Sequence, residues 1–145
     1  MPVVAMSETK VFFDTNVLIH EFSEDATKAS VSEGVMRGGG VISVQVLNEF
    51  ASAGRRKLGL SWAVIRDILR EYRQGLTVVP LTVEVHERGL DLAQRYELNV
   101  YDGMILAAAQ LAGCTVLYSE DMHDGLVIDR LTVRNPYSAN AGNQR

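Results

Sequence analysis

The stretch Lys10-Val11-Phe12-Phe13-Asp14-Thr15-Asn16-Val17-Leu18 decides the fold of this chain. It begins with a short β-prone run that ends at Asp14, and a brief helix is predicted near residues 16–20. Similar short apolar runs lie at residues 41–43, 76–79 and 115–118. Helical periodicity is found between the runs, near residues 25–37, 44–57, after Ser61, 82–96 and 102–111.

Short apolar strands that alternate with helices are typical of an α/β domain with a mainly parallel sheet. We therefore expect a single domain with a central sheet of four to five short strands and helices on both faces. One or two weak strands are expected after Gly125. The domain should span residues 10–137, between a flexible N-terminus (residues 1–9) and a disordered polar tail (residues 138–145).

The composition indicates an ordinary globular domain. Of the 145 residues, 47% are apolar and 22% are charged, which excludes intrinsic disorder. The longest apolar runs fall well short of the roughly 20 residues of a membrane-spanning helix, and no secretory signal is recognisable. Cys114 is the only cysteine, so no internal disulfide can form. These features predict a protein of the reducing cytoplasm, with no membrane partner.

The net charge of −4 is unevenly distributed. Residues 55–73 contain six basic and two acidic side chains, a local charge of +4, which leaves −8 on the rest of the chain. These basic side chains either contact phosphate groups of a ligand or form a solvated helix edge, and the pattern alone does not choose between the two. Trp62, in the same segment, is expected in the core or at an interface between two copies. The six basic residues are Arg55, Arg56, Lys57, Arg66, Arg70 and Arg73.

Four carboxylates fall near the carboxyl ends of the predicted strands, where ligands bind in open α/β sheets. Asp14 follows the first strand and Asp121 follows the strand at residues 115–118. Glu49 lies early in the helix after the second strand. Asp102 starts the helix that leads into residues 115–118, and so lies at the same edge of the sheet. The four side chains are expected to converge.

Each acid also has a simpler interpretation. Asp14 can form an Asx-turn with the backbone, Asp102 can be a helix N-cap, and Glu49 can be solvated. Spacing alone does not choose the last acid from those that follow residue 118, which are Glu120, Asp121, Asp124 and Asp129.

The set of four is harder to explain without a metal. Gathered carboxylates repel one another unless a cation neutralises them. Oxygen ligands suit Mg²⁺ or Mn²⁺, whereas zinc requires His or Cys pairs that this sequence lacks. A metal held by carboxylates keeps positions open for water and phosphate oxygens, so the pattern favours hydrolysis of phosphate esters.

Five segments resemble the PIN-domain ribonucleases, in the same order along the chain. The resemblance begins with the opening stretch and extends over residues 11–137. The remaining segments are Val44-Gln45-Val46-Leu47-Asn48-Glu49-Phe50, Tyr101-Asp102-Gly103-Met104-Ile105-Leu106-Ala107-Ala108-Ala109, Leu117-Tyr118-Ser119-Glu120-Asp121-Met122 and Asn135-Pro136-Tyr137. The small size resembles the toxin of VapBC-type toxin–antitoxin pairs.

The resemblance implies roles for individual residues. Asn16 matches the asparagine that supports the first acid, Ser119 a position at the rim of the site, and Asp124 a possible additional outer acid. Asp121 is preferred to its neighbours because it fits the family's pattern. The acids that match the metal-binding and catalytic set are Asp14, Glu49, Asp102 and Asp121. The resemblance also implies Mg²⁺ or Mn²⁺, structured RNA such as tRNA or rRNA as substrate, a homodimer and a small antitoxin partner.

Three functions compete at this stage. The first is a metal-dependent endoribonuclease that leaves a 5′-phosphate and a 3′-hydroxyl. The second is a phosphatase with Asp14 as nucleophile, which needs a second aspartate where this chain has Asn16. The third is a PIN-like RNA-binding protein without catalysis.

Overall fold

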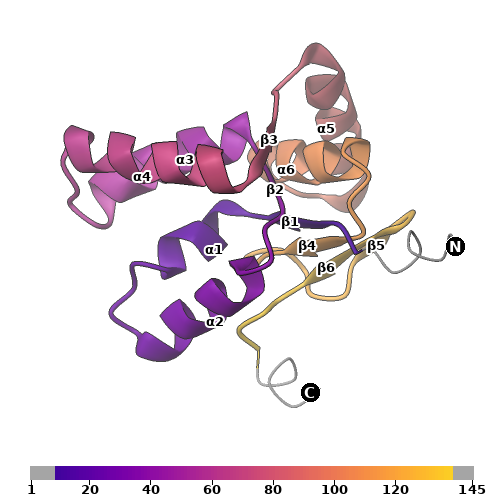
Figure 1. Cartoon of the computed structure of the whole chain (residues 1–145). Coiled ribbons are helices and arrows are strands. Elements are labelled where there is room, and N and C mark those ends of the chain that lie inside the picture. Colours follow the sequence, from indigo (N-terminus) through magenta and orange to yellow (C-terminus); the bar gives the residue numbers. More distant parts are fainter. Residues whose placement is uncertain (1–8, 139–145) are drawn as a thin grey trace, which may run out of the picture.

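The computed structural model describes residues 9–138, which form six helices and six strands (Figure 1). The predicted ends of the chain, residues 1–9 and 138–145, lie outside this range except for Thr9 and Ser138. In chain order the elements are β1 (Val11–Phe13), α1 (Thr15–His20), α2 (Ala26–Met36), β2 (Val41–Ser43), α3 (Val44–Arg56), α4 (Trp62–Gly75), β3 (Thr77–Val79), α5 (Val83–Tyr96), α6 (Val100–Leu111), β4 (Val116–Tyr118), β5 (Val127–Ile128) and β6 (Leu131–Arg134).

The strands form one sheet in the order β3-β2-β1-β4-β6-β5. All neighbours are parallel except β5 and β6, which form an antiparallel hairpin at one edge. The predicted α/β class and the mainly parallel sheet are therefore confirmed. The sheet has six strands rather than the expected four or five, because the segment after Gly125 supplies two. The weak strands expected after Gly125 are thus confirmed, as the two-residue β5 and the four-residue β6.

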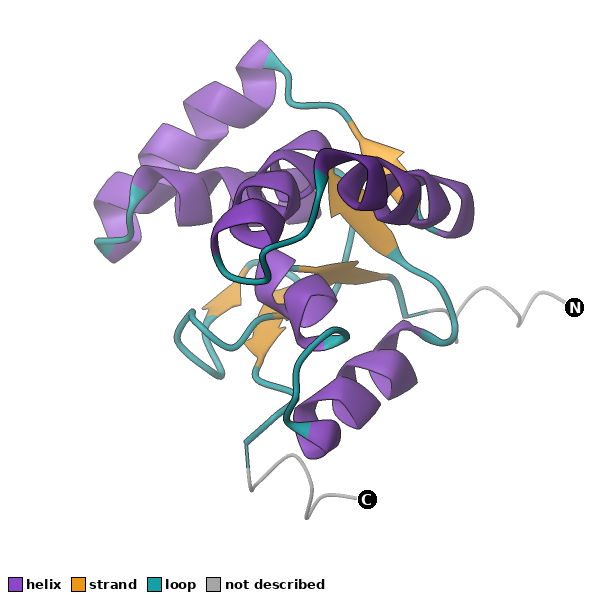
Figure 2. Ribbon diagram, turned by 90° about the vertical axis from the view of Figure 1, so that its left-hand side faces the viewer, coloured by secondary structure: helices purple, strands orange, loops and turns teal. Residues whose placement is uncertain are grey.

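Helices lie on both sides of the strands. α2 lies on one side and α5 and α6 on the other, and the turned view of Figure 2 again shows the strands among the helices. The central strands are buried: Phe12, Phe13, Ile42 and Leu117 have no exposed surface. None of the helices in residues 9–138 is long and apolar enough to cross a membrane.

The helices α5 and α6 pack unusually closely at Gly89 and Gly103. A Cβ placed on Gly103 would lie 2.3 Å from the carbonyl oxygen of Gly89. Only glycine lets the two backbones approach this far. Because Gly103 follows Asp102 directly, the helix contact also determines where the Asp102 carboxylate lies.

Helix caps set the ends of the elements near the site. Ser61 caps α4, as its sequence predicts, and Ser43 caps α3. β1 and β4 are neighbours in register, with Phe13 opposite Tyr118. The residues that follow these two strands therefore leave the sheet side by side.

Candidate active site

Asp14 is the acid most enclosed by the protein. It follows β1, caps α1, and is only 4% exposed. Its Oδ1 accepts a 2.7 Å hydrogen bond from the backbone N–H of Thr15, and its Oδ2 accepts a 2.7 Å bond from the hydroxyl of Ser119. Ser119 is itself fully buried. The carboxylate is thus held by donors on both oxygens.

Burial raises the pKa of Asp14 from 3.8 to about 7. The hydrogen bonds from Ser119 and Thr15 oppose this change, and the charges of Asp102 and Glu49 add to it. A carboxylate in this state favours a proton, or a cation that takes its place.

Asn16 links the first acid to the loop after β4. Its amide nitrogen lies 3.4 Å from Asp14 Oδ2, 3.3 Å from Ser119 Oγ and 3.3 Å from Asp121 Oδ2. Its carbonyl oxygen accepts a 3.1 Å bond from the backbone N–H of Glu120. One side chain therefore brings residues 14 and 119–121 together.

Glu49 is half-buried and held by two donors that the sequence analysis did not single out. Thr15 Oγ1 donates a 2.8 Å bond to one oxygen, and Gln45 Nε2 donates a 2.9 Å bond to the other. Glu49 is therefore held by the protein on both oxygens, while part of its side chain faces the cavity described below. Gln45 precedes Glu49 by four residues on α3, a helical spacing that the sequence displays.

Asp102 lies in the first turn of α6, which begins at Val100 rather than at Asp102. The expectation that Asp102 starts the helix, or caps it, is wrong because Asn99 is the cap. Asn99 Oδ1 accepts a 2.8 Å bond from the Asp102 N–H, and Asn99 Nδ2 donates a 3.1 Å bond to the Asp102 carboxylate. Burial raises the pKa of Asp102, and the charges of Asp121 and Glu49 raise it further.

The four acids thus form one electrostatic group. Asp102 and Glu49 both raise the pKa of Asp14, and Asp121 and Glu49 both raise that of Asp102. The negative charges of the four acids therefore repel one another across the site.

Two neighbouring acids have other contacts. Glu120 accepts 2.6 Å bonds from His20 Nε2 and Lys28 Nζ. Burial raises its pKa, but these two partners lower it more, so the net pKa is below the usual value. Asp124 accepts a 2.9 Å bond from the backbone N–H of Asn135, and so ties its loop to the end of β6 instead of joining the four acids.

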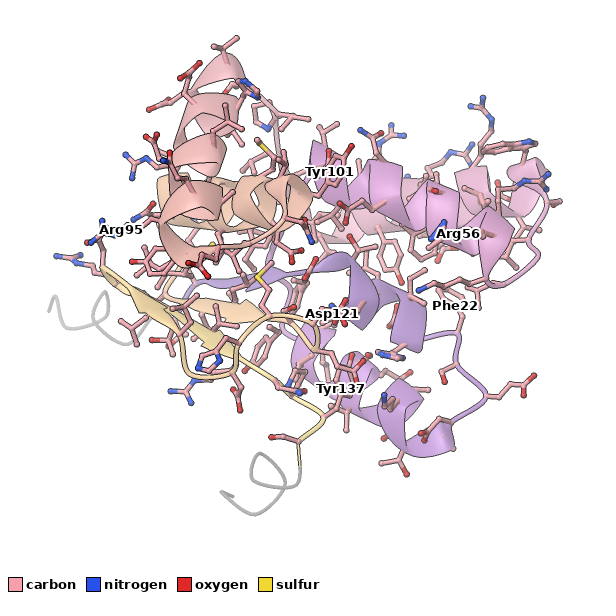
Figure 3. The ribbon with its side chains drawn as sticks, turned by 180° about the vertical axis from the view of Figure 1, so that it is seen from behind. Phe22, Arg56, Arg95, Tyr101, Asp121 and Tyr137 are labelled. Atoms are coloured by element: carbon pink, nitrogen blue, oxygen red, sulfur yellow. The ribbon has the colours of Figure 1, made fainter. Side chains whose placement is uncertain are left out.

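A cavity of about 330 Å³ opens beside the acids. Glu49 and Asp121 line it, and so do Arg56 and Lys57 at the end of α3. Figure 3 places Asp121 near the middle of the molecule and Arg56 on the outer part of the α3–α4 pair. The cavity therefore joins an acidic region to a basic one.

The other basic residues lie on or near α4. Arg66, Arg70 and Arg73 are exposed, and Arg70 pairs with Asp67 at 2.9 Å. Trp62 is 58% exposed, so its expected place in the core is wrong, whereas the expected interface between two copies stays a prediction. At about 100° per residue it lies at the edge of the stripe that contains the buried Ile65 and Tyr72.

The chemistry of the site fits a divalent cation. The donors are carboxylate oxygens that repel one another, the ligand type that Mg²⁺ and Mn²⁺ prefer. Within residues 9–138, however, no group of three or more His, Cys, Asp or Glu side chains has the geometry to hold a metal ion. The type of donor is thus suitable for a divalent cation, but the described side chains do not form a metal site.

Comparison with known families identifies the fold. The model of the PIN domain matches residues 11–123, most of the chain. This chain therefore belongs to the PIN domain family. No curated protein matches the sequence.

Solved structures agree with this assignment. A toxin–antitoxin complex from Klebsiella pneumoniae is 24% identical, with a TM-score of 0.68 over 88% of this chain and 98% of that one. The VapC20 toxin of Mycobacterium tuberculosis, described as cleaving the sarcin-ricin loop, is 14% identical, with a TM-score of 0.63 over 74% of this chain and 87% of that one. DNA-bound VapBC from Salmonella typhimurium is 16% identical, with a TM-score of 0.62 over 89% and 99%.

Proposed function

We propose that this protein is a metal-dependent endoribonuclease that hydrolyses phosphodiester bonds in structured RNA such as tRNA or rRNA. We further propose that it is the toxin of a toxin–antitoxin pair, acts in the cytoplasm as a homodimer, and is restrained by a small antitoxin. The PIN family match and the similarity to structures of toxins and toxin–antitoxin complexes support a PIN nuclease of this kind.

The observation that carries the proposal is the buried Asp14, whose pKa of about 7 reflects burial and the charges of two further acids. The residues proposed to hold Mg²⁺ or Mn²⁺ are Asp14, Glu49, Asp102 and Asp121. When bound, the cation supplies an activated water and neutralises charge that develops on the phosphodiester.

The protein's own side chains have positioning roles in this proposal. Ser119 and the Thr15 N–H hold the Asp14 carboxylate in one orientation. Asn16 keeps the loop with Asp121 against α1. Arg56 and Lys57, at the other end of the cavity, contact phosphates of the RNA strand.

The test is cleavage of purified tRNA and rRNA by the pure protein, with Mg²⁺ or with EDTA. Cleavage should require the divalent ion and should be abolished in Asp14→Asn, which keeps the volume of the side chain. Asp91→Asn, an exposed acid on α5, is the matched control and should cleave normally. Sequencing of the fragments should show 5′-phosphate and 3′-hydroxyl ends.

The remaining alternatives are decided by the same assay. Metal-independent RNA binding without cleavage favours a non-catalytic PIN-like protein. The phosphatase has little support, because Asn16 stands where a general-acid aspartate is needed and is occupied by hydrogen bonds to Asp14, Ser119 and Asp121.

A further inference from the structure

The single tryptophan of the chain is exposed at the start of α4. Trp62 is 58% exposed even though the guanidinium of Arg55 lies over its ring, 4.9 Å from the centroid. Arg55 also donates a 3.0 Å hydrogen bond to the carbonyl oxygen of Leu60, in the loop between α3 and α4. The cation is thus fixed against the indole by the fold.

Trp62 shares one exposed face of α4 with the arginines. At about 100° per residue, Trp62, Arg66, Arg70 and Arg73 fall within an arc of roughly 80°. Arg70 pairs with Asp67, and the ion pairs of residues 9–138 include no partner for Arg66 or Arg73. The face is therefore a basic stripe that begins with an aromatic ring.

This stripe adjoins the cavity of the candidate active site. Arg55 is followed directly by Arg56 and Lys57, which line the cavity. Glu49 and Arg56 are seven residues apart on α3, a rise of about 10 Å. Figure 3 shows Arg56 on the outer part of this helix pair, away from Asp121. A single strand of RNA can therefore run from the acids along α3 to the loop between α3 and α4, next to Trp62.

We propose that Trp62, clamped by Arg55, is a stacking platform for an unpaired base of the RNA substrate, outside the cleavage site. The inference rests on the proposed ribonuclease function and specifies how it holds a substrate. An aromatic ring stacks on any base and so adds affinity without strict sequence preference. The arginines of α4 contact the phosphates on either side of that base.

The charges favour RNA over a protein partner. Residues 55–73 carry a net +4, and the guanidinium of Arg55 lies over the aromatic ring. A second copy of this chain that docked through the same segment would bring +4 against +4, which costs energy. An RNA strand supplies both the negative charges and the planar ring that this surface accepts.

The test uses the fluorescence of Trp62, which has no other tryptophan to obscure it. The full chain, as Asp14→Asn in EDTA, is titrated with a short unstructured RNA of mixed sequence. The fluorescence should be quenched as the RNA binds. An RNA of the same length with abasic riboses should bind through its phosphates, more weakly, and leave the fluorescence unchanged.

Variants separate stacking from charge. Trp62→Ala should weaken binding of the labelled RNA about tenfold to a hundredfold, measured by anisotropy, whereas Trp62→Phe should restore most of the affinity. Val127→Ala truncates an exposed residue of the far β5 strand and serves as the matched control, with unchanged affinity. Circular dichroism checks that each variant is folded.

Three outcomes overturn the inference: equal quenching by abasic RNA, equal quenching by poly-glutamate, or an emission change on concentrating the protein alone, which assigns Trp62 to an interface between copies. The proposed function fails separately. If the wild type does not cleave RNA but the quenching occurs, the stacking site stands without the nuclease. If cleavage occurs and Trp62→Ala binds normally, the nuclease stands without the stacking site.

Discussion

The hydroxyl of Ser119 donates a 2.7 Å hydrogen bond to the carboxylate of Asp14 across 105 positions of sequence. The contact exists because β1 and β4 are parallel neighbours, so the residues after Phe13 and Tyr118 emerge together. It gives the buried acid a donor that partly offsets the cost of its burial. The parallel pairing of β1 and β4 thus places Ser119 where its hydrogen bond lowers the pKa of Asp14.

Replacing this donor should weaken the site without removing an acid. In Ser119→Ala the pKa of Asp14 should rise, since the bond from Ser119 lowers it. A hydrogen bond to a charged group contributes about 1.5–3 kcal/mol, so the affinity for Mn²⁺ should fall by roughly tenfold to a hundredfold. Isothermal titration calorimetry measures the affinity. Ser30→Ala, at an exposed position of α2, is the control, and an equal loss there would contradict this role.

The pH dependence of stability should also report Asp14. The folded pKa of about 7 lies above the ordinary 3.8, so the folded protein binds more protons than the unfolded chain between these values. The contribution to stability is fully present below about pH 4 and is lost as the pH rises toward about 7. It amounts to at most about 4 kcal/mol, from 1.36 kcal/mol per pKa unit.

Urea unfolding of the metal-free protein measures this loss. Asp14→Asn should be more stable than the wild type above about pH 7 and should lack most of the decline. Adding Mn²⁺ should stabilise the wild type, by about 2.7 kcal/mol at a hundredfold excess over its Kd, and should leave Asp14→Asn nearly unchanged. A wild type whose stability rises with pH over this range would refute the account.

Two glycine-to-alanine substitutions should have opposite effects on stability, because one glycine lies in the α5–α6 contact and the other lies in open space on α2. Gly103→Ala puts a Cβ 2.3 Å from the Gly89 carbonyl oxygen and should destabilise the protein by about 1–3 kcal/mol. Gly34→Ala on α2 meets nothing within 4 Å and should stabilise by about 0.5–1 kcal/mol. Thermal unfolding of both variants tests the pair, and stabilisation by Gly103→Ala would show that the helices are not so closely packed.

Substitutions of the adjacent acids Glu120 and Asp121 should have different effects, the first on stability and the second on cleavage. Glu120→Gln loses the contacts with Lys28 and His20 and should cost about 1 kcal/mol of stability, with cleavage largely kept. Asp121→Asn should keep its stability while cleavage falls about a hundredfold. Thermal unfolding and cleavage rates are measured for both. The reverse result, with Glu120→Gln inactive and Asp121→Asn active, would move the fourth acid to Glu120.

Much of the fold follows from local patterns. The run at residues 11–13 and the helix periods were sufficient for an α/β class, and Ser61 for the start of α4. The sequence does not predict the start of α6. Asn99 and Asp102 are both suitable N-cap residues, and only the backbone geometry shows that Asn99 is the cap. The weak strands after Gly125 were expected, but the bounds of β5 could not be predicted because two residues are too few to show a period.

The site was less accessible to sequence reasoning. The acids follow predicted strands or lie in the first two turns of helices, so topology predicts that they lie near one another. The bond from Gln45 to Glu49 follows from their helical spacing, but the bond from Thr15 to Glu49 depends on the packing of α1 against α3 and cannot be predicted. The exposure of Trp62 was missed for a similar reason. Helical spacing shows which residues of α4 share one apolar side, but it does not show which of these residues another helix covers.

The order of the strands has a consequence for synthesis of the protein. Asp14 and Glu49 are made early, but Ser119 and Asp121 come after β4, whose far side pairs with β6. The backbone N–H of Ser119 is bonded to the carbonyl of Arg134. An unfinished chain on the ribosome therefore lacks the last acid and the strand that supports its loop. The site assembles only when translation of the domain is nearly complete.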